Sequence, residues 1–282
     1  MNGCDKEDAP FVETPAIVTT NPGNAPVRKV LLEKFTGHVC GNCPLATIDA
    51  EQLKTFYPDQ IIMYTIHAPD CFSEPQESTT NLGTTYPLNF FFYDFRCQTG
   101  SEIAFEFAGS EFTLPNGMVN RKGGTGNPLL AKNDWAPAVT NILSTPIDAT
   151  LELSSTYNST TRELTAEVNT EFIQAQNGTY NLCVFLVEDS IVNWQLIYDD
   201  IPNYPTGDVE NYVHRHTLRG SMNNTWGEEI ASGSITTGDV ISKTYTTILD
   251  TEWNENQMSI VAFVYDFTTK EVLQAEEVHL QH

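Results

Sequence analysis

The sequence is poor in basic residues, with 14 Lys and Arg against 37 Asp and Glu in 282 residues and a formal net charge of −23. Nucleic-acid binding and electrostatic docking on an anionic leaflet both require basic surface, so the charge argues against both functions. No apolar run approaches the ~20 residues of a membrane-spanning helix. The length predicts one large or two medium domains with a highly charged, self-repelling surface.

Cysteine is also sparse, and the six cysteines include a single CxxC pair, Cys40 and Cys43. One such pair without a second is a weak zinc signal, and His38 or His67 would have to complete the site. Cys183 lies in an apolar β-type stretch and is predicted to be an inert buried thiol. Cys71 and Cys97 remain as a candidate structural disulfide in an oxidising compartment, although sequence does not fix this connectivity.

The CxxC pair stands between a predicted strand and a predicted helix. The apolar run 27–35 predicts a strand, the stripe of apolar residues over 43–56 predicts a helix, and 61–66 reads as a second, buried strand. A CxxC at the helix N-terminus of such a βαβ unit is the sign of a thioredoxin-like fold. Pro115 is the candidate for the cis-proline that this fold places opposite the pair.

Two interpretations of the pair stay open. In the first, Cys40 is the attacking thiolate, favoured by the helix N-terminus, Cys43 is the resolving thiol, and Pro115 shapes the substrate groove. His38 would lower the thiolate pKa if it lies close. In the second, the pair is a stable disulfide at a relic site. Three departures from thioredoxins weaken the redox interpretation, and they lie at Lys34, Val39 and Asn42.

These departures concern proton handling and the shape of the motif. Val39 stands where thioredoxins carry Trp, and Asn42 stands where they carry Pro. Lys34 falls near the position of their buried acid. Glu33 is adjacent, but strand alternation predicts that it points to the opposite face.

After residue 147 the pattern is β throughout. A helix beginning at Asn133 or Asp134 precedes this change, and alternating apolar and polar residues follow it. We predict strands at 149–153, 164–168, 181–188, 212–218, 240–248, 259–267 and 272–280. The expected fold is an α/β thioredoxin-like domain followed by an all-β sandwich, immunoglobulin-like or jelly-roll-like. The predicted division is a tether over 1–26, a thioredoxin-like domain over 27–146 and a sandwich over 147–282.

The second half contains two further candidate sites. His214 and His216 are two residues apart on a predicted strand and would share a face, so they are metal-ligand candidates, although two ligands are too few. The alternative is that both are polar strand residues facing solvent or a domain interface. Several aromatic residues in this half are candidate binding residues or core residues: Trp194, Tyr198, Tyr204, Tyr212 and Trp226.

The N-terminus begins with three residues and then Cys4, which is followed by Lys6, Glu7 and Asp8. This start is typical of a bacterial lipoprotein after signal-peptide removal, with the lipid on Cys4. The alternative is an ordinary cytosolic N-terminus with an incidental cysteine. Residues 14–26 are rich in Pro, Thr, Asn and Gly and are expected to form an extended tether.

The chain resembles the twenty-eight-kilodalton outer-membrane-protein family of Bacteroidetes lipoproteins. The resemblance rests on residues 30–37, on Cys40 to Pro44, on Pro115 with 119–121, on 212–219 and on the closing hairpin. It implies an outer-membrane lipoprotein that is anchored through Cys4 and faces the cell exterior.

The expected role is binding or accessory, with an unidentified protein or glycan partner and no cofactor. An extracytoplasmic thiol–disulfide oxidoreductase using Cys40 and Cys43 is the alternative.

Overall fold

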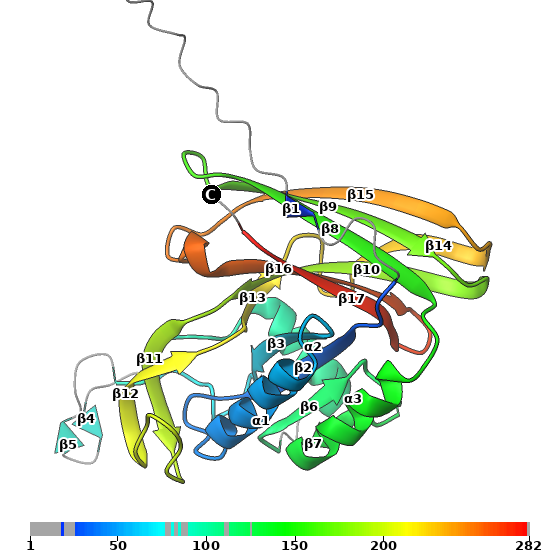
Figure 1. Ribbon diagram of the computed structural model, residues 1–282. Coiled ribbons are helices and arrows are strands. Elements are labelled where there is room, and N and C mark those ends of the chain that lie inside the picture. Colours follow the sequence, from blue (N-terminus) through cyan, green and yellow to red (C-terminus); the bar gives the residue numbers. More distant parts are fainter. Residues whose placement is uncertain are drawn as a thin grey trace, which may run out of the picture.

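The computed structural model describes residues 18–19, 26–76, 80–81, 84–85, 90–109, 113–124 and 126–280. Cys4, and with it the predicted lipid attachment, lies outside these residues. Of the predicted tether, the described part includes β1 (Val18–Thr19), which pairs antiparallel with Ser154 and Ser155 of a later strand. The fold is rich in β-structure (Figure 1).

The predicted strand–helix–strand unit is confirmed. Strand β2 (Val30–Thr36) and strand β3 (Ile61–His67) pair in parallel, and helix α1 (Cys43–Phe56) connects them. Pro44 occupies the first turn of α1, where its missing N–H costs nothing. Every residue of both strands is buried, as expected for parallel strands that are covered on both faces.

The next segment completes this layer. Helix α2 (Gln98–Ala108) is followed by the cis Leu114–Pro115 bond, which confirms the predicted cis-proline. Strand β6 (Asn116–Val119) then pairs antiparallel with β2. The remaining elements of this segment are β4 (Thr80–Asn81), β5 (Thr84–Thr85), β7 (Leu129–Ala131), the short helix η1 (Lys132–Asp134) and α3 (Trp135–Leu143).

The second half consists of strands, with the short helix η2 (Glu255–Gln257) among them. The strands are β8 (Ala149–Asn158), β9 (Glu163–Phe172), β10 (Gln176–Glu188), β11 (Ile191–Ile197), β12 (Gly207–His214), β13 (Thr217–Ser221), β14 (Glu228–Ile235), β15 (Asp239–Ile248), β16 (Met258–Asp266) and β17 (Val272–His279). The sequence did not predict β11 or β14. The strand predicted over 212–218 is two strands, β12 and β13.

Strands from both sides of the predicted boundary at residue 146 share one sheet. Its order is β17-β16-β10-β13-β3-β2-β6-β7, with β14 paired to β10 off this path. The junction is the parallel pairing of β13 with β3, where Thr217 stands opposite Thr65. A second sheet, β1-β8-β9-β15, packs on the half of the large sheet that contains β10 and β16. The division into domains stays a prediction.

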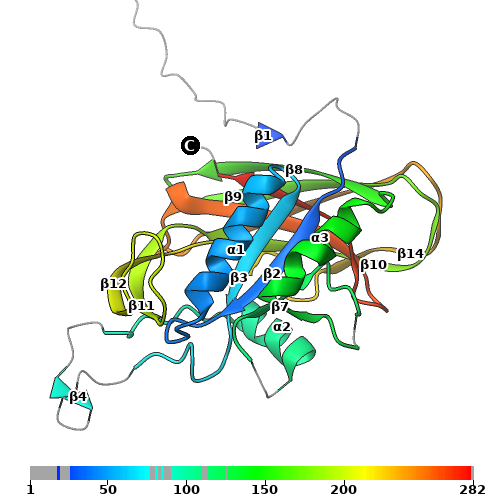
Figure 2. The same ribbon diagram turned by 60° about the horizontal axis from the view of Figure 1, so that its bottom comes forward.

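Three buried clusters hold these layers together. One lies between β8 and β9 on one side and β10 and β16 on the other. A second lies between α2 and the large sheet and joins residues of β2 and β3 to residues of β10, β16 and β17. The third packs α1 and α3 against the opposite face of β2 and β3 (Figure 2). No described helix is long and apolar enough to span a bilayer.

Candidate functional site

Cys40 and Cys43 form a disulfide at the N-terminus of α1. Both are buried, with 3% and 1% of their surface exposed. Pro115 directly precedes Asn116, which stands opposite Phe35 near the C-terminal end of β2. The chain therefore places the cis-proline and the disulfide loop at the same edge of the sheet.

A hairpin from the second half covers the disulfide loop. Strands β11 and β12 form their own two-stranded sheet. Leu196 N donates to His38 O at 2.8 Å, and Tyr198 N donates to Gly41 O at 3.0 Å. Alternate backbone N–H groups of this segment thus bind His38, just before the CxxC motif, and Gly41, inside it, as an added strand would bind a sheet edge.

Side chains strengthen this contact. The amide Nε2 of Gln195 donates to Gly37 O at 3.3 Å and to Cys40 O at 3.2 Å. The ring of Tyr198 lies so close to Gly41 that a Cβ there would stand 2.4 Å from ring carbons. We call the segment Gln195–Tyr198 the cap, because it closes the approach to the disulfide from this side.

The base of the hairpin is pinned by His216, which lies just beyond β12. Its Nε2 is 3.1 Å from Glu51 Oε1 on α1, and its Nδ1 is 3.4 Å from Asp189 Oδ2, just before β11. Arg215 also pairs with Asp189, at 3.3 Å. The two ends of the hairpin are therefore joined to each other and to α1.

The predicted common face for His214 and His216 is wrong. His214 ends β12, and the chain turns at His216, which has a φ of 53° and precedes β13. His214 points into the interior, where its Nε2 is 3.1 Å from Trp194 O. Both histidines are buried rather than solvent-facing. Within the described ranges no cluster of three or more His, Cys, Asp or Glu residues has the arrangement of a metal site.

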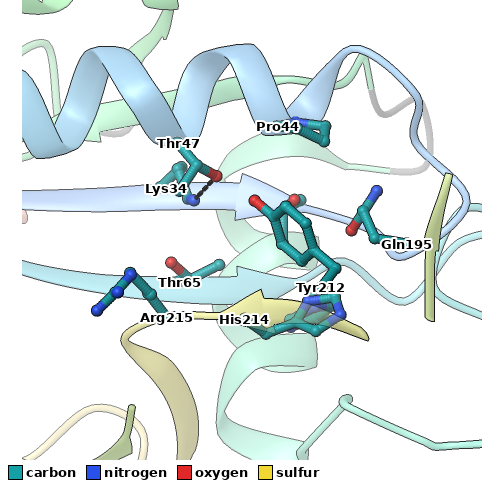
Figure 3. Close-up of a pocket in the computed structure, with 10 residues that line it drawn as sticks. Lys34, Pro44, Thr47, Thr65, Gln195, Tyr212, His214 and Arg215 are labelled. Atoms are coloured by element: carbon teal, nitrogen blue, oxygen red, sulfur yellow. Dashed lines mark hydrogen bonds between the residues drawn. The ribbon is translucent and has the colours of Figure 1, made fainter. Parts of the chain in front are cut away.

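A small polar cavity lies beside the disulfide helix. Its lining combines β2, α1 and β3 with the hairpin (Figure 3). Lys34 Nζ donates to Thr47 Oγ1 at 2.6 Å, and Tyr212 and His214 of β12 lie beside this pair. Its volume of about 10 Å³ is at the lower limit for one water molecule.

Lys34 is buried at this cavity. Burial lowers the pKa of Lys34 to about 8, and the nearby carboxylate of Glu51 offsets part of this effect. The sequence placed a lysine near the position of the thioredoxin acid, and the structure puts its ammonium group inside the protein. A buried amine of lowered pKa is characteristic of functional sites, although ion-pair networks produce it as well.

Three buried histidines of this region are held neutral. Burial lowers the pKa of His38 to about 4 and that of His214 to about 3, and it lowers the pKa of His67 well below its usual value. The rings of His67 and His214 both lie against Phe95, with centroids 4.4 and 4.3 Å away. Because His38 is uncharged at neutral pH, it does not stabilise a thiolate as a cation would.

His67 and Thr65 contribute unpaired polar atoms to this cavity. Within the described part of the protein, the two ring nitrogens of His67 have no hydrogen-bond partner, and the Oγ1 of Thr65 has none either. A buried polar atom without a partner is costly, and an ordered water molecule is the usual remedy.

Glu33 points away from the disulfide side, as strand alternation predicted. It accepts two hydrogen bonds of 2.7 Å from Arg121 and one from the hydroxyl of Tyr64. Arg121 also lies over the rings of Phe263 and Tyr265. This carboxylate is committed to a buried ion pair and does not serve the disulfide.

The other three cysteines within the described residues are free. Cys71 is exposed and Cys97 is half-buried, so the predicted Cys71–Cys97 disulfide is wrong. Cys97 instead caps α2, where its Sγ accepts from Gly100 N at 3.3 Å. Cys183 is fully buried, which confirms the predicted burial of this thiol, and burial raises its pKa to about 12.

A second, larger cavity lies away from the disulfide loop. It has a volume of about 320 Å³ and is formed by residues 92–97, by Leu218 and Arg219 of β13, and by Glu252 and Trp253. Sequence reasoning missed it because its three segments are far apart in the chain. The run Phe90–Tyr93 was the one visible signal, since such an aromatic run in an irregular segment needs a reason to be there.

The aromatic residues proposed as binding residues have mixed positions. Trp194 and Tyr212 are buried, the former packed against Phe90 and Phe91. Tyr204 lies against Tyr212 with ring centroids 4.9 Å apart, and Tyr198 belongs to the cap. Trp226 packs elsewhere, near Phe107. These residues do not form one binding surface.

Comparison with known proteins gives a family and a fold. The model of the outer membrane protein Omp28 family matches residues 104–282. The structure of HBP35 of Porphyromonas gingivalis is 16% identical, with a TM-score of 0.65, and the match covers 92% of this chain and 77% of that one. A domain of the outer membrane lipoprotein Omp28 from the same organism is 20% identical over 49% of this chain and 91% of that one, with a TM-score of 0.33. No curated protein matches.

Proposed function

The chain belongs to the Omp28 family of outer membrane proteins, and from this premise we propose that it is a lipid-anchored binding protein of the cell surface. In this proposal residues 27–146 are a thioredoxin-like scaffold, and the facing sheets of residues 147–282 are a sandwich built onto it. The β2–α1–β3 unit, the disulfide at the start of α1 and the cis Pro115 support the first assignment. The packing of β8 and β9 on β10 and β16 supports the second.

One observation favours the binding role over the redox role: the cap covers the disulfide. Attack on a disulfide needs a thiolate to reach one of its sulfurs. Cys40 is 3% exposed, and the cap holds its loop through Leu196 and Tyr198. A working oxidoreductase keeps its attacking sulfur accessible. The disulfide is therefore assigned a structural role, that of fixing the loop on which the cap rests.

The rate of disulfide reduction tests this proposal. We expect dithiothreitol to reduce Cys40–Cys43 slowly in the folded protein and rapidly in guanidinium, and we expect no catalysis of insulin reduction. A Cys183→Ser variant is the matched control, because Cys183 is buried and takes no part in either the structural or the redox role of the disulfide. Insulin reduction that is lost in Cys40→Ser and kept in Cys183→Ser contradicts the structural role.

Thiol–disulfide exchange remains the second candidate function, since the cis Pro115 and the position of Cys40 at a helix N-terminus favour it. It requires displacement of the cap before the substrate arrives. In that case the reduction potential of Cys40–Cys43 lies well above about −300 mV, the upper range of structural disulfides. A lower potential supports the structural role.

The lipid anchor has its own test. The full-length protein is expressed in its own cells with labelled fatty acid. Label that is incorporated into the wild type and into Cys71→Ser, but not into Cys4→Ser, supports the anchor. Digestion of the protein by a protease added to intact cells supports an exterior location. An unlabelled protein, or one protected until the cells are lysed, contradicts the corresponding part of the proposal.

A further inference from the structure

We propose that the 320 Å³ cavity formed by residues 92–97, β13 and Glu252–Trp253 is a binding site for a neutral sugar. This inference rests on the proposed binding role and names the ligand class. The volume falls at the lower end of the range of small-molecule sites. We call this cavity the aromatic cavity, after Phe92, Tyr93, Phe95 and Trp253 in its lining.

The aromatic rings supply the first requirement. Phe92, Tyr93 and Trp253 are each only half-buried at the cavity. The face of an aromatic ring carries negative charge density, so it attracts the weakly positive C–H groups on the face of a sugar ring. Half-buried rings that line a hollow have surface left for such a contact.

The polar groups supply the second requirement, a mixture of donors and acceptors. Arg219 Nη2 donates to the hydroxyl oxygen of Tyr93 at 2.6 Å, which leaves the Tyr93 O–H free to donate. Arg96 uses Nε and Nη2 on Asp94, each at 2.9 Å, so its Nη1 is available. The carboxylate of Glu252 is an exposed acceptor at the rim. A sugar hydroxyl both donates and accepts, and it matches this mixture.

The arrangement of charge selects a neutral ligand. Arg219 is paired with Glu188 at 2.7 Å and Arg96 with Asp94, so both guanidinium groups of the lining are already neutralised. A cationic ligand would find only the exposed carboxylate of Glu252, and an ion pair at such an exposed site contributes little. The same carboxylate and the net charge of −23 disfavour an anionic ligand. A charged ligand therefore gains little over a neutral one.

The floor of the aromatic cavity is rigid. The side chains of Arg219 and Glu188 are 7% and 5% exposed. Glu188 also accepts from Asn254 N at 2.9 Å, and the Arg219 guanidinium lies over the rings of Tyr93 and Trp253. One buried ion pair therefore fixes both aromatic walls, and such preorganisation lowers the entropy cost of binding.

The chain carries its own reporter of occupancy. Cys97 lines the aromatic cavity as a free thiol, whereas Cys71 is free, exposed and absent from the lining. A bound ligand should slow the alkylation of Cys97 by iodoacetamide without changing the rate at Cys71. Mass spectrometry of the two peptides reads both rates from one sample.

The test is calorimetric titration of the full chain with neutral hexoses, neutral N-acetylhexosamines and their disaccharides, together with the Cys97 alkylation rate. We expect at least one of these sugars to bind and to protect Cys97. Trp253→Ala should weaken binding about tenfold, the loss of one aromatic contact. Because Trp253 also packs on the core, Glu252→Gln at the exposed rim is a second variant and should also weaken binding. Phe56→Ala, an exposed residue of α1, is the control.

Three results overturn the inference. The first is that no neutral sugar of the panel binds or protects Cys97 at millimolar concentration. The second is binding that survives both Trp253→Ala and Glu252→Gln. The third is a preference for sialic acid, for glucosamine or for a tyrosine-containing peptide over every neutral sugar. The proposed binding function is tested separately from the sugar site, and it is contradicted if Cys40–Cys43 catalyses insulin reduction.

Discussion

The guanidinium of Arg121 and the carboxylate of Glu33 form a two-point ion pair in which neither side chain has any exposed surface. Glu33 lies on β2, and Arg121 lies over rings of β16, so the pair links two strands that are not neighbours in the large sheet. Burial of an ion pair costs as much as its attraction returns, but removal of one partner leaves an uncompensated charge.

We therefore expect Arg121→Met to lower the free energy of unfolding by about 3–5 kcal/mol. The double variant Glu33→Leu/Arg121→Met should recover part of that loss, because no lone charge remains. Urea unfolding followed by circular dichroism measures both. The single variant Glu33→Leu is measured as well. If the free energy of unfolding falls in the double variant by as much as the sum of its falls in Glu33→Leu and Arg121→Met, the unpaired charge is not what makes Arg121→Met destabilising.

The cap gives a prediction about disulfide access. In Gly41→Ala the new methyl group would overlap the ring of Tyr198, and such overpacking typically costs about 1–3 kcal/mol. The contact opens more often, so dithiothreitol should reduce Cys40–Cys43 roughly tenfold to hundredfold faster.

Tyr198→Ala in the Gly41→Ala background removes the overlap and serves as the paired control. Without the Tyr198 ring the overlap with the new methyl group at position 41 is gone, so the strain at this position is relieved. The same loss of the ring leaves Cys40 more exposed. If reduction is equally slow in the wild type and in both variants, the cap does not control access.

The buried histidines predict an acid-labile fold. Burial holds the pKa of His38 at about 4 and that of His214 at about 3, both below the unfolded value of about 6.5. Below pH 6.5 the unfolded chain takes up protons that the folded chain refuses, so stability falls as pH falls. The loss continues until the folded pKa values are reached.

Between pH 6 and pH 4 the slope should be steepest near pH 5, where it approaches about 1.4 kcal/mol per pH unit for each such histidine. Urea midpoints measured across this range supply it. His38→Gln should flatten the slope by about one histidine's share. A stability that is unchanged from pH 7 to pH 4.5 argues against buried neutral histidines.

The free thiols give a fourth prediction, on reactivity in the non-reduced, folded protein. Cys71 should alkylate fastest because it is exposed, Cys97 more slowly because burial raises its pKa, and Cys183 only on unfolding. Peptide mapping after timed iodoacetamide treatment gives the order. Recovery of a Cys71–Cys97 disulfide-linked peptide contradicts the free thiols described above.

Local signals predicted much of the first half of the fold. Cys43–Phe56 was predicted as a helix with both of its ends correct, because Pro44 starts it and Pro58 follows its end. The opposite orientation of Glu33 followed from strand alternation alone. Each of these signals lies within a few residues of the feature that it determines.

What the sequence did not predict depends on long-range pairing. The parallel contact of β13 with β3 places Thr217 opposite Thr65, and no sequence pattern near either residue predicts this pairing. The same holds for the cap, which binds a loop more than 150 residues earlier through backbone atoms, and backbone groups are alike in every sequence. His214 and His216 were placed on one face because the positive φ of His216 has no local signal such as glycine.

Strand β10 presents its two faces to two different cores. Leu182, Val184 and Leu186 enter the core beneath β8 and β9, while Cys183, Phe185 and Val187 enter the core beneath α2. A chain cut after residue 146 would therefore leave each fragment with an uncovered apolar face. We expect both fragments to aggregate when made separately, and the intact chain to melt in a single calorimetric transition, so that the two halves fold only as one unit.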